Sequence, residues 1–259
     1  MDWGIFYNFC ANCKIKRFGV CIAALCAVAA VSAATETGDK EPFWLGGDIS
    51  GMNATRLRVW VNPKDGFCSP EDVLKMAKRS QALGMPVMID FHYSDWWADP
   101  GKQNPPKAWL GMTLEQTEKA LADHTRQTLR LLKDNGIDVK WVQVGNETTH
   151  GFLWPMGRFE ENPVNYASLT KAGIKAVREV YPEAEVIIHL DNGFDQGLYD
   201  RVFDSLKSNG VEWDTIGISV YPYWAPEWNA EDDYRLGAFS RNMPTVIMDA
   251  FKEAASSAR

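Results

Sequence analysis

Short apolar runs alternate with longer amphipathic stretches along most of this sequence. Six of the runs have the length and composition of buried strands: Phe43–Ile49, Ala54–Trp60, Val87–Phe91, Trp141–Val144, Val186–Ile188 and Thr215–Val220. Strands that alternate with helices pair in parallel, because a parallel connection needs a crossover long enough to hold a helix. The pattern therefore predicts an α/β fold built on a parallel sheet.

The helices between these strands carry recognisable end signals. Ser69 and Pro70 supply an N-cap and a first-turn proline, and Gly84 follows as a stop signal. The segment Leu114–Lys133 repeats leucine at helical spacing, and Gly136 comes soon after it. We expect both helices to turn their apolar stripes toward a core.

Two stretches depart from a regular (β/α)8 repeat. Four residues separate Ile49 from Ala54, whereas a parallel crossover needs about a dozen or more. Near the other end, Asn242–Ala255 has helical periodicity, although Pro244–Ala250 could instead be a strand ending near Asp249. Counted in this way, the sequence predicts a (β/α)8 barrel without its first helix and without its seventh and eighth strands.

The first part of the chain has the features of an export signal. Lys14, Lys16 and Arg17 precede the apolar run Phe18–Val31, and small residues up to Ala33 offer a cleavage site. A transmembrane anchor is the alternative, but it needs about 20 apolar residues, more than this run contains. We expect residues 1–33 to be a signal peptide and residues 34–259 to form one partial barrel domain. The protein would then be secreted, periplasmic or at the cell surface.

Charge narrows the range of partners. The formal net charge is −7, and removal of residues 1–33, with three basic residues and one acidic, would change it to −9. A chain this acidic is repelled by phosphate backbones and anionic lipid. The balance argues against nucleic acid or a membrane surface as a partner and favours a neutral substrate.

Metal and cofactor chemistry find little support. Of the five cysteines, four lie within residues 1–33, which leaves Cys68 alone and provides no disulfide framework. A metal-dependent hydrolase could use His92, His150 and His189, but the sequence has no His-x-His pair. We expect no metal and no cofactor.

The segment Lys140–Thr148 runs from an apolar strand directly into Asn146 and Glu147. In parallel α/β barrels, catalytic groups lie where strands end. A carboxylate after a strand is also a common helix cap, and histidines are often core residues. The functional interpretation gains weight because His92, His189 and Tyr221 fall at the ends of other strands.

Aromatic residues gather on the loops after these strands, and they suit the apolar faces of sugars. They are Trp60, Tyr93, Trp96, Trp97, Trp154, Tyr223, Trp224 and Trp228. Each could equally be a partly buried loop residue. Glycoside hydrolysis needs an acid to protonate the leaving oxygen and a second carboxylate, and Glu147 fits the first role.

Three segments together resemble one family of enzymes: Thr55–Trp60, Asp90–Pro100 and Trp141–Thr148. They are similar to the arabinogalactan endo-β-1,4-galactanases, family 53 of the glycoside hydrolases. The pair Ile188-His189 and the run Ser219–Trp224 continue the resemblance in order.

The resemblance implies a (β/α)8 TIM-barrel glycosidase that acts on internal bonds of galactan or arabinogalactan with retention of configuration. It implies Glu147 as acid/base with Asn146 as its partner. Residues implied to line the cleavage subsite are Arg58, His92, His189 and Tyr221, and those implied for the sugar-binding groove are Asp95, Trp96, Trp97 and Trp224.

The family's nucleophile is a glutamate on the seventh strand, which we do not find in this sequence. We therefore expect little or no galactanase turnover from this polypeptide, as a fragment of a hydrolase. The alternative is a non-catalytic galactan-binding fragment. Neither interpretation implies a protein partner, and we expect a monomer.

Overall fold

The computed structural model describes residues 5–10, 19–22, 54–193 and 195–219. In these ranges one sheet is formed by β1 (Ile5–Cys10), β2 (Gly19–Ile22), β3 (Thr55–Val59), β4 (Val87–Phe91), β5 (Val139–Val144), β8 (Glu185–Leu190) and β9 (Thr215–Ile218). A small hairpin consists of β6 (Gly151–Phe152) and β7 (Gly157–Arg158). The helices are α1 (Pro70–Ala82), the 3-10 turn η1 (Lys107–Trp109), α2 (Leu114–Asp134), α3 (Pro163–Val180) and α4 (Gln196–Ser208).

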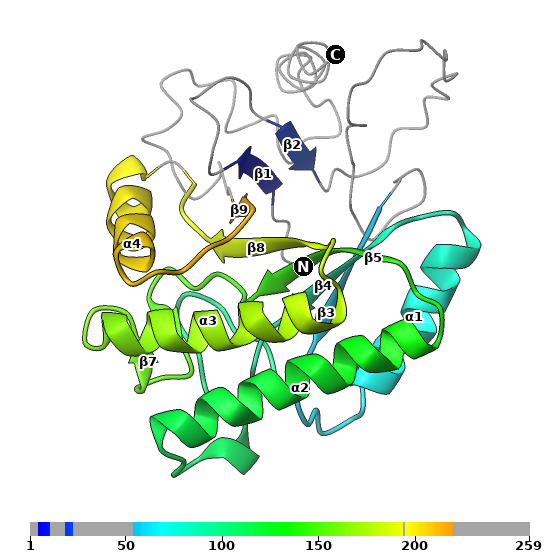
Figure 1. Ribbon diagram of the computed structural model, residues 1–259, viewed down its shortest axis with the longest axis horizontal. Helices are drawn as coiled ribbons and strands as arrows, with labels where there is room; N and C mark the ends of the chain where they lie inside the picture. The colour runs from blue at the N-terminus through cyan, green and yellow to red at the C-terminus, as the bar shows by residue number, and fades with distance from the viewer. Residues whose placement is uncertain (1–4, 11–18, 23–53, 194, 220–259) are drawn as a thin grey trace, which may run out of the picture.

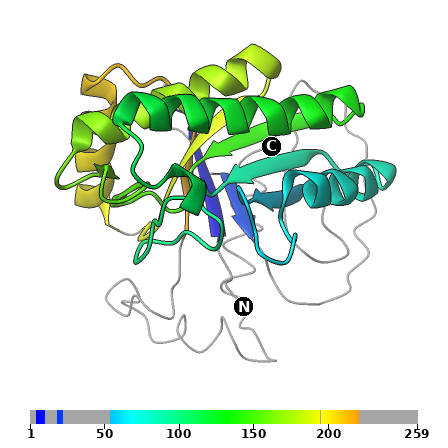
Figure 2. The same cartoon turned by 90° about the horizontal axis from the view of Figure 1, so that it is seen from below.

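The parallel strands stand in the sheet in the same order as in the chain, β3-β4-β5-β8-β9. Because parallel crossovers are right-handed, a sheet that advances in one direction receives all its helices on one face. Figures 1 and 2 show α1, α2, α3 and α4 following one another along that face. This is the wall of a barrel, whereas a doubly wound sheet reverses its order and has helices on both faces. Beyond β9, β1 and β2 pair antiparallel.

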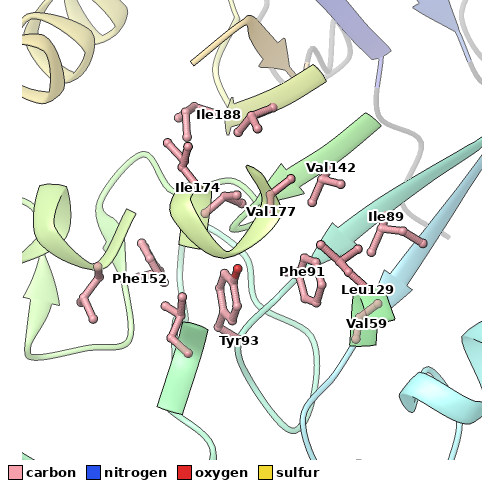
Figure 3. Packing of buried hydrophobic residues seen from close by; sticks show 14 of the residues in the cluster. Val59, Ile89, Phe91, Tyr93, Leu129, Val142, Phe152, Ile174, Val177 and Ile188 are labelled. Carbon is pink, nitrogen blue, oxygen red and sulfur yellow. The ribbon is translucent and has the colours of Figure 1, made fainter. Parts of the chain in front are cut away.

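The main hydrophobic core lies between the strands and the helices. Ile89 and Phe91 of β4 and Val142 of β5 form one buried cluster with Leu129 of α2 and Val177 of α3 (Figure 3). Burying one such side chain fully contributes roughly 1.5–3 kcal/mol relative to leaving it exposed. Alternate residues of the same strands point to the opposite face of the sheet, the one that carries none of the described helices, which is the inner face of the barrel.

The predicted parallel α/β sheet is confirmed, and so are the end signals of two helices. The Ser69 hydroxyl accepts a hydrogen bond from the Asp72 amide at the start of α1, and the predicted Leu114–Lys133 helix is α2. The expected strand Phe43–Ile49 and the expected helix Asn242–Ala255 lie outside the described residues.

Two short strands, β1 and β2, fall within residues 1–33. Signal cleavage and export stay predictions. None of the helices in the described ranges is both long enough and apolar enough to cross a bilayer.

Close packing of α3 on the sheet gives a first test. A Cβ added at Gly173 would lie 2.7 Å from Val144 Cγ1 and 3.1 Å from the Tyr93 hydroxyl oxygen. We predict that Gly173→Ala lowers the free energy of unfolding by about 1–3 kcal/mol, because overpacking outweighs the better helix propensity of alanine. In the control Gly197→Ala on α4, the nearest atom is 3.6 Å away, so the change should be neutral or slightly stabilising. Urea denaturation measures both, and equal effects would contradict the close approach.

His124 of α2 gives a second test. Its ring stands edge-on to Phe91, Tyr93 and Trp109, with centroid distances of 5.7, 6.4 and 6.3 Å. Burial lowers the pKa of the His124 ring to about 4, although the Asp95 charge opposes this. Between about pH 6.5 and pH 4, His124 is therefore protonated in the unfolded chain and neutral in the folded chain.

We predict that the free energy of unfolding falls as the pH drops from 6.5 to 4 and that His124 contributes roughly 2 kcal/mol of this fall. His124→Phe keeps the aromatic contacts and removes the titrating group, so its stability curve should be flatter over the same interval. Parallel curves for the two proteins would show that His124 does not titrate in this way.

Candidate active site

The inner face of the sheet changes from apolar to polar toward the carboxyl ends of the strands. The lower layer contains Ala54, Met88, Trp141 and Ile187, which pack on one another. One step higher on the same strands are Arg56, Asp90, Gln143 and His189, and the next step brings Arg58 on β3 and His92 just after β4. The polar layers stand at the end where parallel barrels carry their active sites.

An ion pair organises the polar layer. Arg56 Nη2 lies 2.8 Å from Asp90 Oδ2, and Asp90 is fully buried. Gln143 Nε2 donates to Asp90 Oδ1 at 2.6 Å, and Arg56 Nη2 donates to Gln143 Oε1 at 3.1 Å. Burial alone would raise the pKa of the Asp90 carboxyl, but Arg56 and His92 outweigh it and hold that pKa below its ordinary value. Asp90 is therefore a charged structural anchor.

The same carboxylate fixes the tautomer of His92. The Ala98 amide donates to His92 Nδ1 at 3.0 Å, so this nitrogen is an acceptor and the ring hydrogen is on Nε2. Nε2 then donates to Asp90 Oδ2 at 3.2 Å. Both nitrogens of the buried ring thus hydrogen-bond to the protein. Only the carbon atoms of the ring remain for a van der Waals contact with a sugar.

Asn146 is oriented by donors beneath it. Its Oδ1 accepts from Arg56 Nη2 at 2.8 Å and from Gln143 Nε2 at 3.3 Å, while its Nδ2 donates to the Ala98 oxygen at 2.8 Å. The Oδ1 side of the amide is therefore directed into the barrel, and a second hydrogen on Nδ2 is available to donate to a ligand hydroxyl.

Glu147 adopts a left-handed backbone conformation, with φ of +48°, two residues after Gly145, which has φ of +88°. The Glu147 amide donates to His189 Nδ1 at 3.2 Å, and the Thr148 amide donates to the His189 oxygen at 2.8 Å. Non-glycine residues in this region cost about 1–3 kcal/mol and persist where the surroundings hold them, often at functional sites. The strand thus turns sharply at its end, and Glu147 remains 8% exposed.

His189 is the neutral partner of this turn. Its Nδ1 accepts the Glu147 N–H, and its Nε2 hydrogen-bonds Ser219 Oγ at 2.9 Å. Burial and the Arg56 charge lower the pKa of His189 well below its ordinary value. Asn146 Oδ1 also lies 3.2 Å from Nδ1, but the Glu147 N–H can only donate, so Nδ1 is an acceptor and the backbone amide is its partner.

An aromatic surface lies beside these groups. The rings of Trp60 and Trp96 are 4.8 Å apart between centroids, and Trp96 is 55% exposed. The Arg58 guanidinium lies 3.9 Å above the Trp97 ring, which also meets His92 edge-on at 5.7 Å. An exposed indole on a rigid support is a suitable platform for the apolar face of a sugar.

The implied site residues are therefore only partly assembled in the described part of the chain. Arg58, His92, Asn146, Glu147 and His189 lie at adjacent strand ends. Trp96 and Trp97 lie on the loop after β4, while Tyr221 and Trp224 lie outside the described ranges.

Asp95 differs from these groove residues. Its Oδ1 accepts from the Asn62 amide at 3.0 Å and its Oδ2 from the Lys107 amide at 2.9 Å. The carboxylate braces two loops, and its contact with a sugar stays a prediction.

Sequence reasoning missed Arg56, Asp90 and Gln143 as members of the site, as well as Gln103, whose amide contacts the backbone of Asn146. A signal existed for the first two, since Arg56 and Arg58 on one strand, and Asp90 and His92 at the end of the next, are two positions apart and share a face. Within residues 54–193 and 195–219, no cluster of His, Cys, Asp or Glu could hold a metal ion.

Comparison with known families matches residues 19–247 to Glycosyl hydrolase family 53. The chain belongs to this family. A probable arabinogalactan endo-β-1,4-galactanase A of Neosartorya fischeri is 37% identical over 184 residues, which are 68% of this chain and 51% of the relative. An endo-β-1,4-galactanase of Bacillus subtilis is 37% identical over 183 residues, covering 68% of this chain and 42% of the relative.

Solved family 53 structures share the fold. The catalytic domain from Ignisphaera aggregans matches with a TM-score of 0.64 and 39% identity, over 67% of this chain and 50% of that one. A fungal β-1,4-galactanase matches with a TM-score of 0.59 and 38% identity, over 62% and 48%. The expected (β/α)8 fold class is thereby confirmed. The chain spans about half the length of the curated relatives it matches.

The buried ion pair predicts a large stability effect. Asp90→Asn removes the charge that faces Arg56 and should lower the free energy of unfolding by about 3–5 kcal/mol, because the partly buried Arg56 guanidinium loses its carboxylate and the fully buried site loses its charge balance. Asp123→Asn is the matched control on the surface of α2, where Asp123 pairs with Lys119 and Arg126, and it should cost less than about 1 kcal/mol. Chemical denaturation compares the two, and similar losses would contradict the anchoring role of Asp90.

Proposed function

We propose that this protein is an endo-acting, retaining glycoside hydrolase that cleaves β-1,4-galactosidic linkages in galactan or arabinogalactan, with Glu147 as acid/base. The observation that carries the proposal is the braced Asn146–Glu147 turn at the end of β5, together with the Trp60–Trp96 surface on the loops after the neighbouring strands β3 and β4. Two family 53 relatives with endo-β-1,4-galactanase in their names support the choice of substrate.

The geometry suits proton donation to a glycosidic oxygen. Glu147 is nearly buried yet reaches the surface, so a carboxyl there is shielded from bulk water and still accessible to a polysaccharide. Asn146 can donate to a sugar hydroxyl through Nδ2, and Trp96 can stack on a neighbouring sugar. These contacts would place the scissile bond over Glu147.

A retaining mechanism also needs a carboxylate nucleophile about 5–5.5 Å from the acid. Asp90 is committed to Arg56, Asp95 holds two backbone amides, and Asp191 accepts a hydrogen bond from the Thr149 hydroxyl. We therefore assign no nucleophile among the residues the structure describes, and the expectation of little or no turnover from this polypeptide stays a prediction, which the wild-type hydrolysis rate in the test below checks. Export through residues 1–33 and a monomeric state remain parts of the proposal.

A non-catalytic galactan-binding protein is the second candidate. The exposed Trp96 ring on its Trp60 support favours it, because stacking on a sugar requires no reacting group.

Glu147→Gln tests the acid role. We predict that release of reducing ends from β-1,4-galactan falls by about a hundredfold or more, because the amide cannot donate the proton. Affinity for a galactooligosaccharide, measured by calorimetry, should change by less than about threefold, because the isosteric amide retains most ground-state contacts. Glu160→Gln is the control: Glu160 pairs with His150 at the surface, and its loss should leave hydrolysis unchanged.

The outcomes separate the candidates. Equal hydrolysis by wild type and Glu147→Gln would refute the acid role of Glu147. Binding by the wild-type chain without release of reducing ends would favour the binding protein. Absence of both galactan binding and hydrolysis would count against both candidates.

A further inference from the structure

Gln103 lies on the loop after β4 and is 1% exposed. Its Nε2 donates to the main-chain oxygen of Asn146 at 2.8 Å and lies 3.2 Å from that of Asp99 and 3.3 Å from that of Glu147. An amide nitrogen has two hydrogens, so one is committed to Asn146 and the other is shared between Asp99 and Glu147. One side chain thus joins the loop after β4 to both Asn146 and Glu147, which form the turn called the acid turn below.

The oxygens held by Gln103 belong to a stretch that has left the sheet. β5 ends at Val144, and beyond it Asn146 and Glu147 are buried outside the sheet. A buried main-chain oxygen needs a donor. Gln103 supplies donors to the carbonyl groups, while His189 accepts the Glu147 N–H. The left-handed backbone of Glu147 is therefore held through both its oxygen and its nitrogen.

The loop that presents Gln103 is itself restrained. The main chains of Asp99 and Lys102 exchange two hydrogen bonds of 3.0 Å, and their side chains form an ion pair at 2.9 Å. The main-chain oxygen of Gln103 accepts from the Trp154 amide at 2.8 Å. The main chain at Gln103 is thus held in place by contacts within its own loop and with Trp154, so the side chain can restrain the acid turn.

We propose that Gln103 is a positioning residue that holds the Asn146–Glu147 backbone in the turn from which Glu147 presents its carboxyl group. Its consequence for catalysis rests on the proposed hydrolase function, whereas the restraint on the backbone does not. Loss of the restraint misdirects the acid, so it slows the glycosylation step of substrates whose leaving oxygen needs a proton and spares the glycosylation step of substrates whose leaving group departs unprotonated.

Aryl β-1,4-galactobiosides test the catalytic consequence. Gln103→Met keeps the length of the side chain and removes both donors. We expect kcat/KM, which reports formation of the glycosyl-enzyme, to fall about tenfold or more with a poor phenol leaving group, and less than about threefold with 2,4-dinitrophenol, which leaves without protonation. Equal losses with both substrates would overturn the acid-positioning role.

Gln103→Glu provides a second variant with a pH readout. Its carboxyl donates one hydrogen bond when protonated and none when ionised. Its kcat/KM relative to wild type should fall as the pH rises with the poor leaving group, while the relative kcat/KM with 2,4-dinitrophenol should stay level. A level ratio for both substrates would count against the proposal, and this comparison is available even if Gln103→Met does not fold.

Hydrogen exchange tests the restraint without any turnover. We expect the amides of residues 145–149 to exchange about tenfold faster or more in the Gln103 variants, with no change in residues 139–144 of β5. Gln81→Met is the matched control. The Gln81 amide donates to the Gly136 oxygen at 2.8 Å, in the turn that precedes β5, whereas the acid turn follows β5. It should leave residues 145–149 unchanged.

Unchanged exchange at residues 145–149, or a uniform rise across β5, would overturn the proposal. If the wild-type chain hydrolyses neither galactobioside, the proposed hydrolase function fails on its own, and the exchange measurement still decides whether Gln103 restrains the turn.

Discussion

The ion pair between Arg56 and the fully buried Asp90 is the interaction on which the rest of the site depends. A fully buried carboxylate is tolerated only when its charge is compensated and its oxygens are hydrogen-bonded. Arg56 supplies the charge, and Gln143 and His92 supply further N–H donors to the two oxygens. Because these four residues come from or directly follow three adjacent strands, satisfying one carboxylate also fixes how the inner faces of those strands meet.

The donor and acceptor roles of the residues around Asp90 follow from two groups that each have a single role, the Asp90 carboxylate and the Arg56 guanidinium. Asp90 can only accept, so His92 donates through Nε2 and must accept the Ala98 amide through Nδ1. Arg56 can only donate, so Asn146 turns its Oδ1 downward and its Nδ2 toward the Ala98 oxygen. Few alternative arrangements satisfy all of these groups together. The orientation of the residue next to the candidate acid therefore follows from a charge placed one layer deeper in the barrel.

Local patterns in the sequence were sufficient for much of the fold. The apolar run Val87–Phe91 is β4, and the Ser69 cap does begin α1. Site residues that depend on contacts between distant segments could not be found in this way. The role of Asp90 depends on register, which places it opposite Arg58 on β3 and Gln143 on β5. Gln103 reaches the Asn146 oxygen from 43 positions away, and no spacing rule in a single sequence reports such a contact.

Glu147 shows why this degree of bracing is needed. A proton donor must stay shielded from water and still meet a polymer at the surface, so it cannot lie within a strand or at the tip of a free loop. A left-handed residue at a strand end meets both demands, at an energetic cost that the surrounding contacts must offset. His189 on the Glu147 amide and Gln103 on the carbonyl groups provide those contacts, while Arg56 holds the side chain of the adjacent Asn146. The position of the candidate acid is thus set by the side chains of His189 and Gln103, whose bracing atoms bond to the backbone and need not touch the substrate.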